Sequence, residues 1–185
     1  MYNYTKIHCN IYFMSIIVDS STSHLPEIKS FVEAVRQYCK IIESIDNQKE
    51  LCIFLRQVAA SIAYLYTCVF DLPEISLKYK FTKVISKSGE YEKSLSSLLG
   101  SYNFYNISLA PLDLTQPELA IGALSDDLGE LYSDLKSALD CFDRRELSYV
   151  EHSLWSWKFG FETHWGEHLT NALQHIHFLL FDQYV

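Results

Sequence analysis

The fold of this chain is decided by residues 155–180, which read WSWKFGFETHWGEHLTNALQHIHFLL. This stretch carries all three tryptophans of the protein, four of its seven histidines and two of its six glycines. Aromatic side chains of this size supply much of the apolar area that a small domain buries. The stretch therefore predicts the centre of a packed core, and nothing in it is a diagnostic catalytic signature.

As a helix, the stretch separates into an apolar stripe and a histidine edge. Successive residues advance by roughly 100° around a helix axis, so residues three and four apart share a face. His164, His168 and His175 then line one edge of the stripe, and Glu162 falls inside it. A buried carboxylate would need a partner. The stripe consists of Phe161, Trp165, Leu169, Ala172, Leu173, Ile176 and Leu180.

Two glycines interrupt this helical pattern, Gly160 and Gly166. A glycine inside a helix costs about 1 kcal/mol relative to alanine. Helices carry such glycines where another backbone approaches closely or where the axis bends. The helical region from about Arg144 to Leu180 is too long to be straight in a domain of this size. We therefore expect a bend near Gly160 or Gly166.

The composition is that of a packed acidic protein. Of the 185 residues, 49% are hydrophobic and 15% aromatic, and the formal net charge is −8. This length and composition predict one domain with a substantial core. No basic surplus is present to neutralise phosphates, so we expect the protein to bind neither nucleic acid nor an anionic membrane.

The apolar runs indicate neither a membrane span nor a secretion signal. We expect none of them to be long enough to cross a bilayer. The run Ile11–Val18 is short and lacks a small-residue cleavage site, unlike a signal peptide. The sequence therefore predicts a cytoplasmic protein.

The cysteines support a reducing compartment. Their count is odd, their spacings are wide and no C-x-x-C motif is present, unlike a disulfide scaffold or a zinc site. We expect small buried side chains with free thiols. The five are Cys9, Cys39, Cys52, Cys68 and Cys141.

Four further segments show helical periodicity with start or stop signals. Pro26 suits the first turn of one helix, and Asn47 with Glu50 resembles a capping box before the next. Ser125 precedes two aspartates, a combination typical of a helix start. The expected helices cover residues 26–42, 51–69, 90–99 and 125–142.

The middle of the chain is less regular. Residues 101–113 are aromatic and read as a cover over the bundle or as the wall of a pocket, and a short helix is expected from Thr115 to Gly122. Together these segments predict an all-α antiparallel helical bundle of about five to seven helices. We expect a single helical domain over residues 25–185, preceded by a poorly anchored extension over residues 1–24.

Three blocks of sequence occur together in this chain: Gly122-x-Leu124-Ser125-Asp126-Asp127-Leu128, Tyr132-x-Asp134-Leu135, and Trp155-x-Trp157-x-Phe159-x-Phe161-Glu162-x-His164-Trp165-Gly166-x-His168. In this combination the chain resembles a bacterial helical family catalogued as domain of unknown function 5063. The resemblance covers roughly Phe31 to His177 and implies an all-helical bacterial cytosolic protein, without an activity, substrate or cofactor. Residues 1–24 fall outside it.

One polar constellation has the spacing of a metal site. His164 and His168 are four residues apart and face the same way on a helix. Asp127 and Asp134 lie two turns apart on an edge of another helix and would complete a four-ligand site for zinc, iron or manganese. In the other interpretation, the imidazoles donate to these carboxylates in a buried polar network without a metal. Both interpretations require the two helix edges to face each other.

A second constellation is aromatic. Glu162 beside Trp157 and Trp165 would form a carboxylate in an aromatic pocket, with its pKa raised for acid–base chemistry. Alternatively, Glu162 pairs with Lys158 one turn away or with a tyrosine hydroxyl. Tyr105, from the aromatic segment, is the further residue assigned to this ligand or partner pocket.

The chain lacks the local motifs of common enzymes, because it has no G-x-S-x-G and no phosphate loop. No catalytic residue is assigned. We therefore expect a non-enzymatic binding or protein-interaction module with a protein partner and no cofactor. The alternative is a metal-binding protein or metal-dependent enzyme that uses the Asp/His site between the two C-terminal helices.

Overall fold

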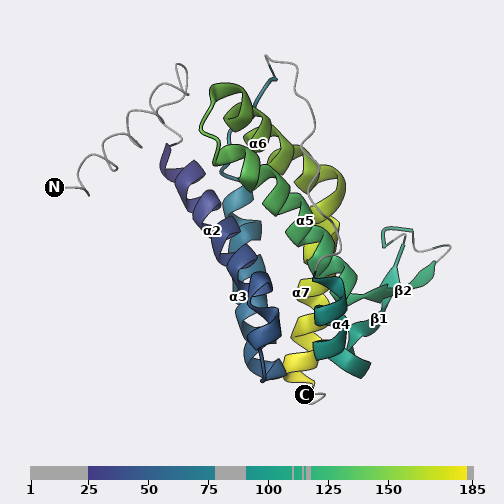
Figure 1. Cartoon of the computed structure of the whole chain (residues 1–185). Coiled ribbons are helices and arrows are strands. Elements are labelled where there is room, and N and C mark those ends of the chain that lie inside the picture. Colours follow the sequence, from purple (N-terminus) through teal and green to yellow (C-terminus); the bar gives the residue numbers. More distant parts are fainter. Residues whose placement is uncertain (1–24, 78–90, 110, 114, 116–117, 183–185) are drawn as a thin grey trace.

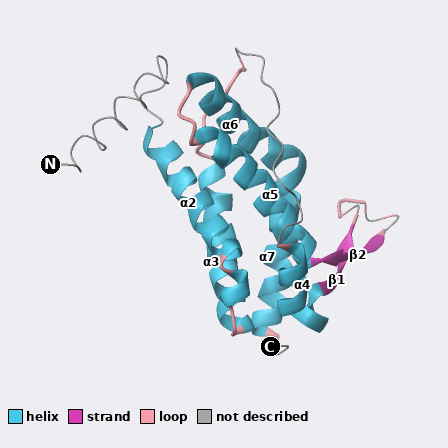
Figure 2. Cartoon of the chain, in the orientation of Figure 1, coloured by secondary structure: helices cyan, strands magenta, loops and turns pink. Residues whose placement is uncertain are grey.

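The computed structural model describes residues 25–77, 91–109, 111–113, 115 and 118–182. Within them, long helices lie side by side in an antiparallel bundle and a short β-hairpin stands against one side (Figure 1, Figure 2). The predicted all-α bundle is therefore confirmed, with a small sheet added. The expected extension over residues 1–24 lies outside the described residues.

Helices α2 (Leu25–Glu43) and α3 (Leu51–Val69) pack against each other, as their short connection predicts. The turn between them contains the 3-10 helix η2 (Ile45–Asn47). Asn47 is the last residue of this 3-10 helix. Helix α3 begins after Glu50, whose side chain makes no capping hydrogen bond. The expected capping box is therefore not formed, although both helices are found where the periodicity places them.

Helix α3 is long and apolar enough, by length and composition alone, to cross a membrane. This finding corrects the expectation that no segment of the chain passes that test. In the structure, α3 packs against α2 and α7. A buried core helix reaches the same apolar content, so the segment is weak evidence for a span. Its buried residues are Phe54, Leu55, Val58, Ser61, Ile62, Leu65, Cys68 and Val69.

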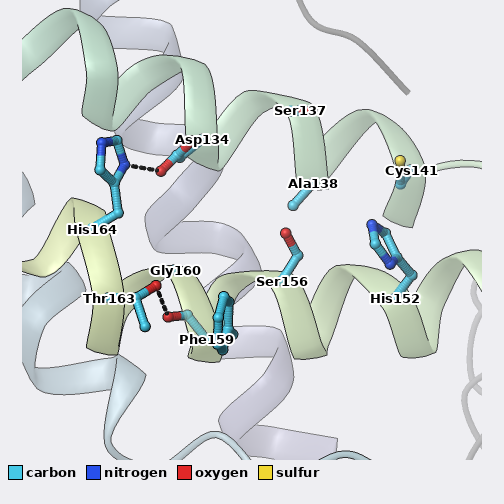
Figure 3. A pocket seen from close by; sticks show the side chains of 10 residues that line it. All are labelled: Asp134, Ser137, Ala138, Cys141, His152, Ser156, Phe159, Gly160, Thr163 and His164. Atoms are coloured by element: carbon cyan, nitrogen blue, oxygen red, sulfur yellow. Dashed lines mark hydrogen bonds and ion pairs between the residues drawn. The ribbon is translucent and has the colours of Figure 1, made fainter. Parts of the chain in front are cut away.

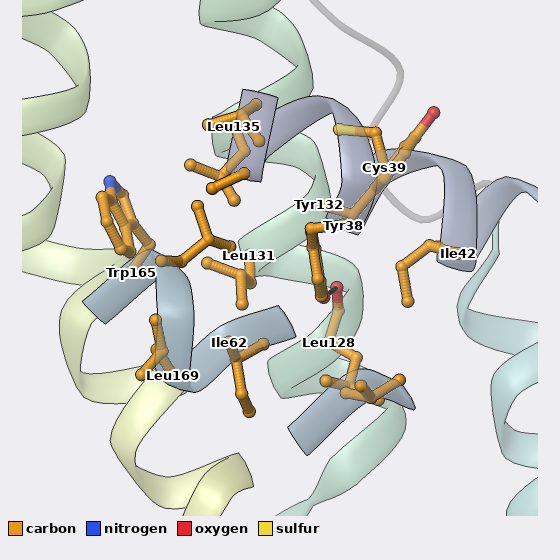
Figure 4. Close-up of a cluster of buried hydrophobic side chains, with 14 of the residues drawn as sticks. Tyr38, Cys39, Ile42, Ile62, Leu128, Leu131, Tyr132, Leu135, Trp165 and Leu169 are labelled. Carbon is orange, nitrogen blue, oxygen red and sulfur yellow. Dashed lines mark hydrogen bonds between the residues drawn. The ribbon is translucent and has the colours of Figure 1, made fainter. Parts of the chain in front are cut away.

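Helix α5 (Leu124–Phe142) lies centrally and contacts α2, α4 (Glu92–Leu99), α6 (Leu147–Gly160) and α7 (Gly166–Phe181). Its apolar stripe explains this position, because Leu128, Leu131 and Leu135 are fully buried. Figure 4 shows these leucines among side chains of α2, α3 and α7. The Tyr38 hydroxyl of α2 donates a hydrogen bond of 2.8 Å to the Leu128 carbonyl, which satisfies the one polar atom of a buried phenol.

The sequence predicts a bend near Gly160 or Gly166, and the structure has a π-helical turn between these two glycines. Residues Phe161–Trp165 form a π-helical turn (η4) that joins α6 to α7. A Cβ atom on Gly166 would lie 2.2 Å from the carbonyl oxygen of Phe161, and one on Gly160 would lie 2.8 Å from the indole Cδ1 of Trp165. A side chain at either position would clash with these atoms, so the geometry of the turn favours glycine at both.

The segment before α5 forms a hairpin of β1 (Phe104–Ser108) and β2 (Leu119–Ala123). The strands are antiparallel, with Phe104 opposite Ala123 and Ser108 opposite Leu119. The expected short helix from Thr115 to Gly122 is therefore wrong, because its second half is β2. The hairpin contacts the bundle at α5 and places a β-strand next to the N-terminus of that helix.

Candidate functional site

Two aspartates of α5 face two histidines across the contact with the C-terminal helices. His164 Nδ1 lies 2.8 Å from Asp134 Oδ2, and His168 Nδ1 lies 2.8 Å from Asp127 Oδ1. His164 belongs to the π-helical turn and His168 to the first turn of α7. The prediction that these two helix edges face each other is confirmed, and the contacts are direct carboxylate–imidazole hydrogen bonds.

These hydrogen bonds fix the orientation and tautomer of both imidazole rings. A carboxylate is an acceptor, so Nδ1 of each ring carries the hydrogen and donates it. The second ring nitrogen, Nε2, is then the atom that remains for a proton or a metal ion. Figure 3 shows this for His164, whose Nδ1 faces Asp134 while its other nitrogen lies on the far side of the ring.

The inner pair, Asp127 with His168, is the more buried of the two. The Asp127 residue is 6% exposed, whereas the side chains of Asp134 and His164 are both more than a third exposed. The hydrogen bond to Asp127 raises the pKa of His168; the nearby charges of Asp126 and Glu130 act in the same direction, and burial opposes them. The inner pair therefore favours the imidazolium form of His168.

Tyr105 of β1 joins the inner pair to the hairpin. Its hydroxyl donates a hydrogen bond to Oδ2 of Asp127. Burial and this carboxylate raise the pKa of the Tyr105 hydroxyl. The Tyr105 ring stacks on the His175 imidazole of α7 with 4.3 Å between centroids, and His175 Nε2 donates to the Tyr102 carbonyl at 2.9 Å. Stacking and hydrogen bonds together hold the hairpin against α5 and α7.

Asn103 adds a contact that the sequence did not indicate. Its side-chain oxygen accepts a hydrogen bond of 2.8 Å from the backbone N–H of Ser125, in the first turn of α5. The expected cap, the Ser125 side chain, is not used, because α5 begins at Leu124 without a cap of its own. The side chain of Asn103, 22 residues earlier in the sequence, accepts the hydrogen bond of a free backbone N–H at the start of the helix instead. No local sequence motif indicates such a distant partner.

The predicted aromatic pocket does not form as one site. Trp157 and Trp165 are each 1% exposed and belong to the core. The Trp157 indole N–H donates to the Leu135 carbonyl, and that of Trp165 donates to the Trp157 carbonyl. Glu162 is exposed, which corrects its expected place inside the buried stripe. The π-helical turn shifts the phase of the helix here, so a constant 100° per residue misplaces that residue.

The four predicted metal ligands come together as two pairs and not as one cluster. Among the residues that the structure describes, no group of three His, Cys, Asp or Glu side chains is arranged to hold a metal ion. The four-ligand site therefore stays a prediction, whereas the alternative hydrogen-bonded network matches the observed distances.

A pocket of about 290 Å³ lies beside the outer pair, between α5 and the α6–η4 segment (Figure 3). Asp134 and His164 form one end, and Cys141 and His152 form the other. Burial lowers the pKa of His152. The volume is at the lower limit for a small-molecule site. Ser137, Ser156 and Thr163 also line the pocket, and the Thr163 hydroxyl donates a hydrogen bond to the Phe159 carbonyl.

Comparisons with known proteins identify a family and a fold. A family model described as Domain of unknown function (DUF5063) matches residues 22–182. The crystal structure of protein BF1032 from Bacteroides fragilis, a structural genomics target, has a TM-score of 0.70 and 20% identity, covering 83% of this chain and 91% of that one. At this identity the likeness shows the fold alone. No curated protein matches the chain.

Proposed function

Because the chain belongs to the family of unknown function DUF5063, we propose its role from its own surface: it is a non-enzymatic interaction module that binds a protein partner through the β1–β2 hairpin. The observation that carries this proposal is the apolar outer face of the hairpin. Phe104, Leu119 and Ile121 are 63%, 70% and 75% exposed.

The strand register places these three side chains on one face. Side chains alternate along a strand, so residues 104, 106 and 108 share a face with their partners 123, 121 and 119. Single exposed apolar residues are common on protein surfaces, but three on one small sheet form a patch. In the described part of the chain, the sheet has only these two strands. Each therefore offers one unpaired edge that can pair with a further strand.

The opposite face of the hairpin, which carries Tyr105 and Gly122, is fixed to the helical bundle and holds the apolar patch in place. Tyr105 is fixed by Asp127 and His175, and a Cβ atom on Gly122 would lie 2.9 Å from the Tyr105 ring. An isolated two-stranded hairpin is marginally stable in water, so these contacts are needed to hold it. A surface held in place loses less conformational entropy when a partner binds.

The charge around the hairpin favours a basic partner. Residues 94–135 contain six acidic residues and no lysine or arginine. Two copies of this surface would repel each other, which disfavours self-association through the hairpin. We therefore assign the occupant as an extended segment of another protein that alternates basic and apolar residues. Its backbone would extend the sheet, and its apolar side chains would continue the outer face.

The test uses a fluorescent peptide that alternates lysine with isoleucine, and a matched peptide that alternates glutamate with isoleucine. Fluorescence anisotropy should show binding of the lysine peptide only, weakened by salt. Ile121→Ser should lower the affinity at least several-fold. The matched control, Phe70→Ser, removes a similarly exposed side chain from the end of α3 and should leave the affinity unchanged.

Two outcomes would overturn the proposal. One is equal affinity of wild type and Ile121→Ser for the lysine peptide. The other is self-association of the wild-type protein in sedimentation experiments that Ile121→Ser abolishes, because the occupant would then be a second copy of the chain.

A further inference from the structure

The imidazoles of His164 and His168 are close enough to act together. They lie on consecutive turns, with 4.8 Å between ring centroids and 73° between ring planes. Four residues separate them, so both rings lie on the same side of the helix. Two nitrogen ligands on adjacent helical turns are the arrangement from which one helix can chelate a metal ion.

The partners of the two rings are those of metal-binding histidines. In such sites the second ring nitrogen usually donates to a carboxylate or carbonyl, which fixes the ring and raises the basicity of the ligating nitrogen. Asp134 and Asp127 occupy this position, each bonded to Nδ1 of its own histidine. Nε2 is the coordinating atom left on each ring.

We propose that His164 and His168 bind one divalent transition-metal ion through their Nε2 atoms, while Asp134 and Asp127 orient the rings. This assignment does not rest on the proposed hairpin interaction, although Asp127 also holds Tyr105 of the hairpin. It also changes the ligand set predicted from the sequence, because the aspartates bind the imidazoles and not the metal. Imidazole nitrogen suits zinc, copper and nickel. The other coordination positions belong to water or to an exchangeable ligand, so this is an open site and not a structural one.

Charge and access both favour a cation at this position. The absence of lysine and arginine from residues 94–135 leaves the α5 edge acidic, and Glu130 lies on that edge between the two aspartates. The His164 and His168 side chains are 47% and 23% exposed, so a metal ion from solvent reaches His164 directly and His168 beside it.

The test uses untagged full-length protein after chelator treatment and dialysis. Calorimetric titration with Zn²⁺ should show one site, and Cu²⁺ at the same site should give an electron paramagnetic resonance spectrum with coupling to two imidazole nitrogens. His164→Gln and His168→Gln should each abolish this site. Asp134→Asn should weaken Zn²⁺ binding 10- to 100-fold, the range for loss of a carboxylate that orients a ligating histidine.

His177→Gln is the matched control, because His177 is an exposed histidine of α7 outside the pair. It should leave the affinity unchanged. Since His164 is exposed, its variant is expected to fold, and circular dichroism checks this. The proposal is overturned if His164→Gln binds Zn²⁺ as wild type does, if Asp134→Asn has no effect, or if the Cu²⁺ spectrum shows fewer than two nitrogen ligands.

Discussion

The Asp127 carboxylate accepts hydrogen bonds from both the Tyr105 hydroxyl and the His168 imidazole, one on each of its oxygens. A residue at the start of α5 thereby connects the hairpin to α7. The same carboxylate takes part in both proposed sites. It holds the hairpin that carries the apolar patch, and it orients His168, one of the two proposed metal ligands.

The hydrogen bond between Tyr105 and Asp127 is tested by Tyr105→Phe. The variant keeps the ring that stacks on His175 and removes only the hydroxyl. A hydrogen bond to a charged group contributes about 1.5–3 kcal/mol when buried, so a half-buried one should contribute about 1–2 kcal/mol. Urea unfolding measures this loss. Tyr66→Phe on α3 is the control, and equal stability of the two variants would contradict the role of this bond.

Trp165 tests the assignment of the core. Its side chain is 1% exposed and packs against Phe161, with 4.9 Å between ring centroids. Trp165→Ala should lower the free energy of unfolding by about 3–5 kcal/mol, because it removes a large buried side chain and leaves a cavity. Thermal and denaturant unfolding provide the measurement. A melting temperature within a degree or two of wild type would mean that Trp165 does not lie in the core.

Gly166 and Gly129 form a matched pair of helical glycines with opposite expected effects. Gly166→Ala should destabilise the protein by about 1–3 kcal/mol or more, because the new methyl group would meet the Phe161 carbonyl in the π-helical turn. At Gly129 the nearest atom to an added Cβ is 3.9 Å away. Gly129→Ala should therefore be neutral or stabilising by up to about 1 kcal/mol. The same sign for both substitutions would contradict the geometry of the turn.

The raised pKa of His168 predicts a pH dependence of stability. A group whose pKa is higher in the folded state stabilises the fold fully below its unfolded pKa, near 6.5 for histidine. This contribution is lost as the pH rises through the higher folded pKa of His168. In buffer with chelator, wild type should lose more stability than His168→Gln between pH 6 and pH 9. Parallel stability curves for the two proteins would show that the pair does not titrate in this way.

The thiols are tested by their reactivity. The cysteines that the structure describes, Cys39, Cys52, Cys68 and Cys141, are all free. Titration in denaturant should recover five thiols per chain, the full count of the sequence. In the native protein Cys39 should react far more slowly than Cys52, because burial raises its pKa to about 12. Recovery of fewer thiols from fresh protein would contradict the predicted reducing compartment.

The sequence by itself determined the helices and the pairing of their edges. Helical periodicity is local, so the stripes of α2, α3, α5 and α7 could be recognised one at a time. Asp127, Asp134, His164 and His168 each border a stripe that has to be buried. Burying those stripes against each other brings the two edges into contact, so contact between these carboxylates and imidazoles could be predicted, although not which residue pairs with which.

Only the tertiary structure decided the remaining features, because each depends on atoms far away in sequence or on a change of helical period. The hairpin pairs Phe104 with Ala123, and Asn103 caps α5, through contacts that no local pattern encodes. A constant period of 3.6 residues per turn predicts Glu162 on the buried face. The π-helical turn that contains Glu162 has a different period, so this prediction is wrong. The division of the polar cluster into two pairs follows from the side-chain geometry across α5 and α7, where each carboxylate lies nearest a different imidazole.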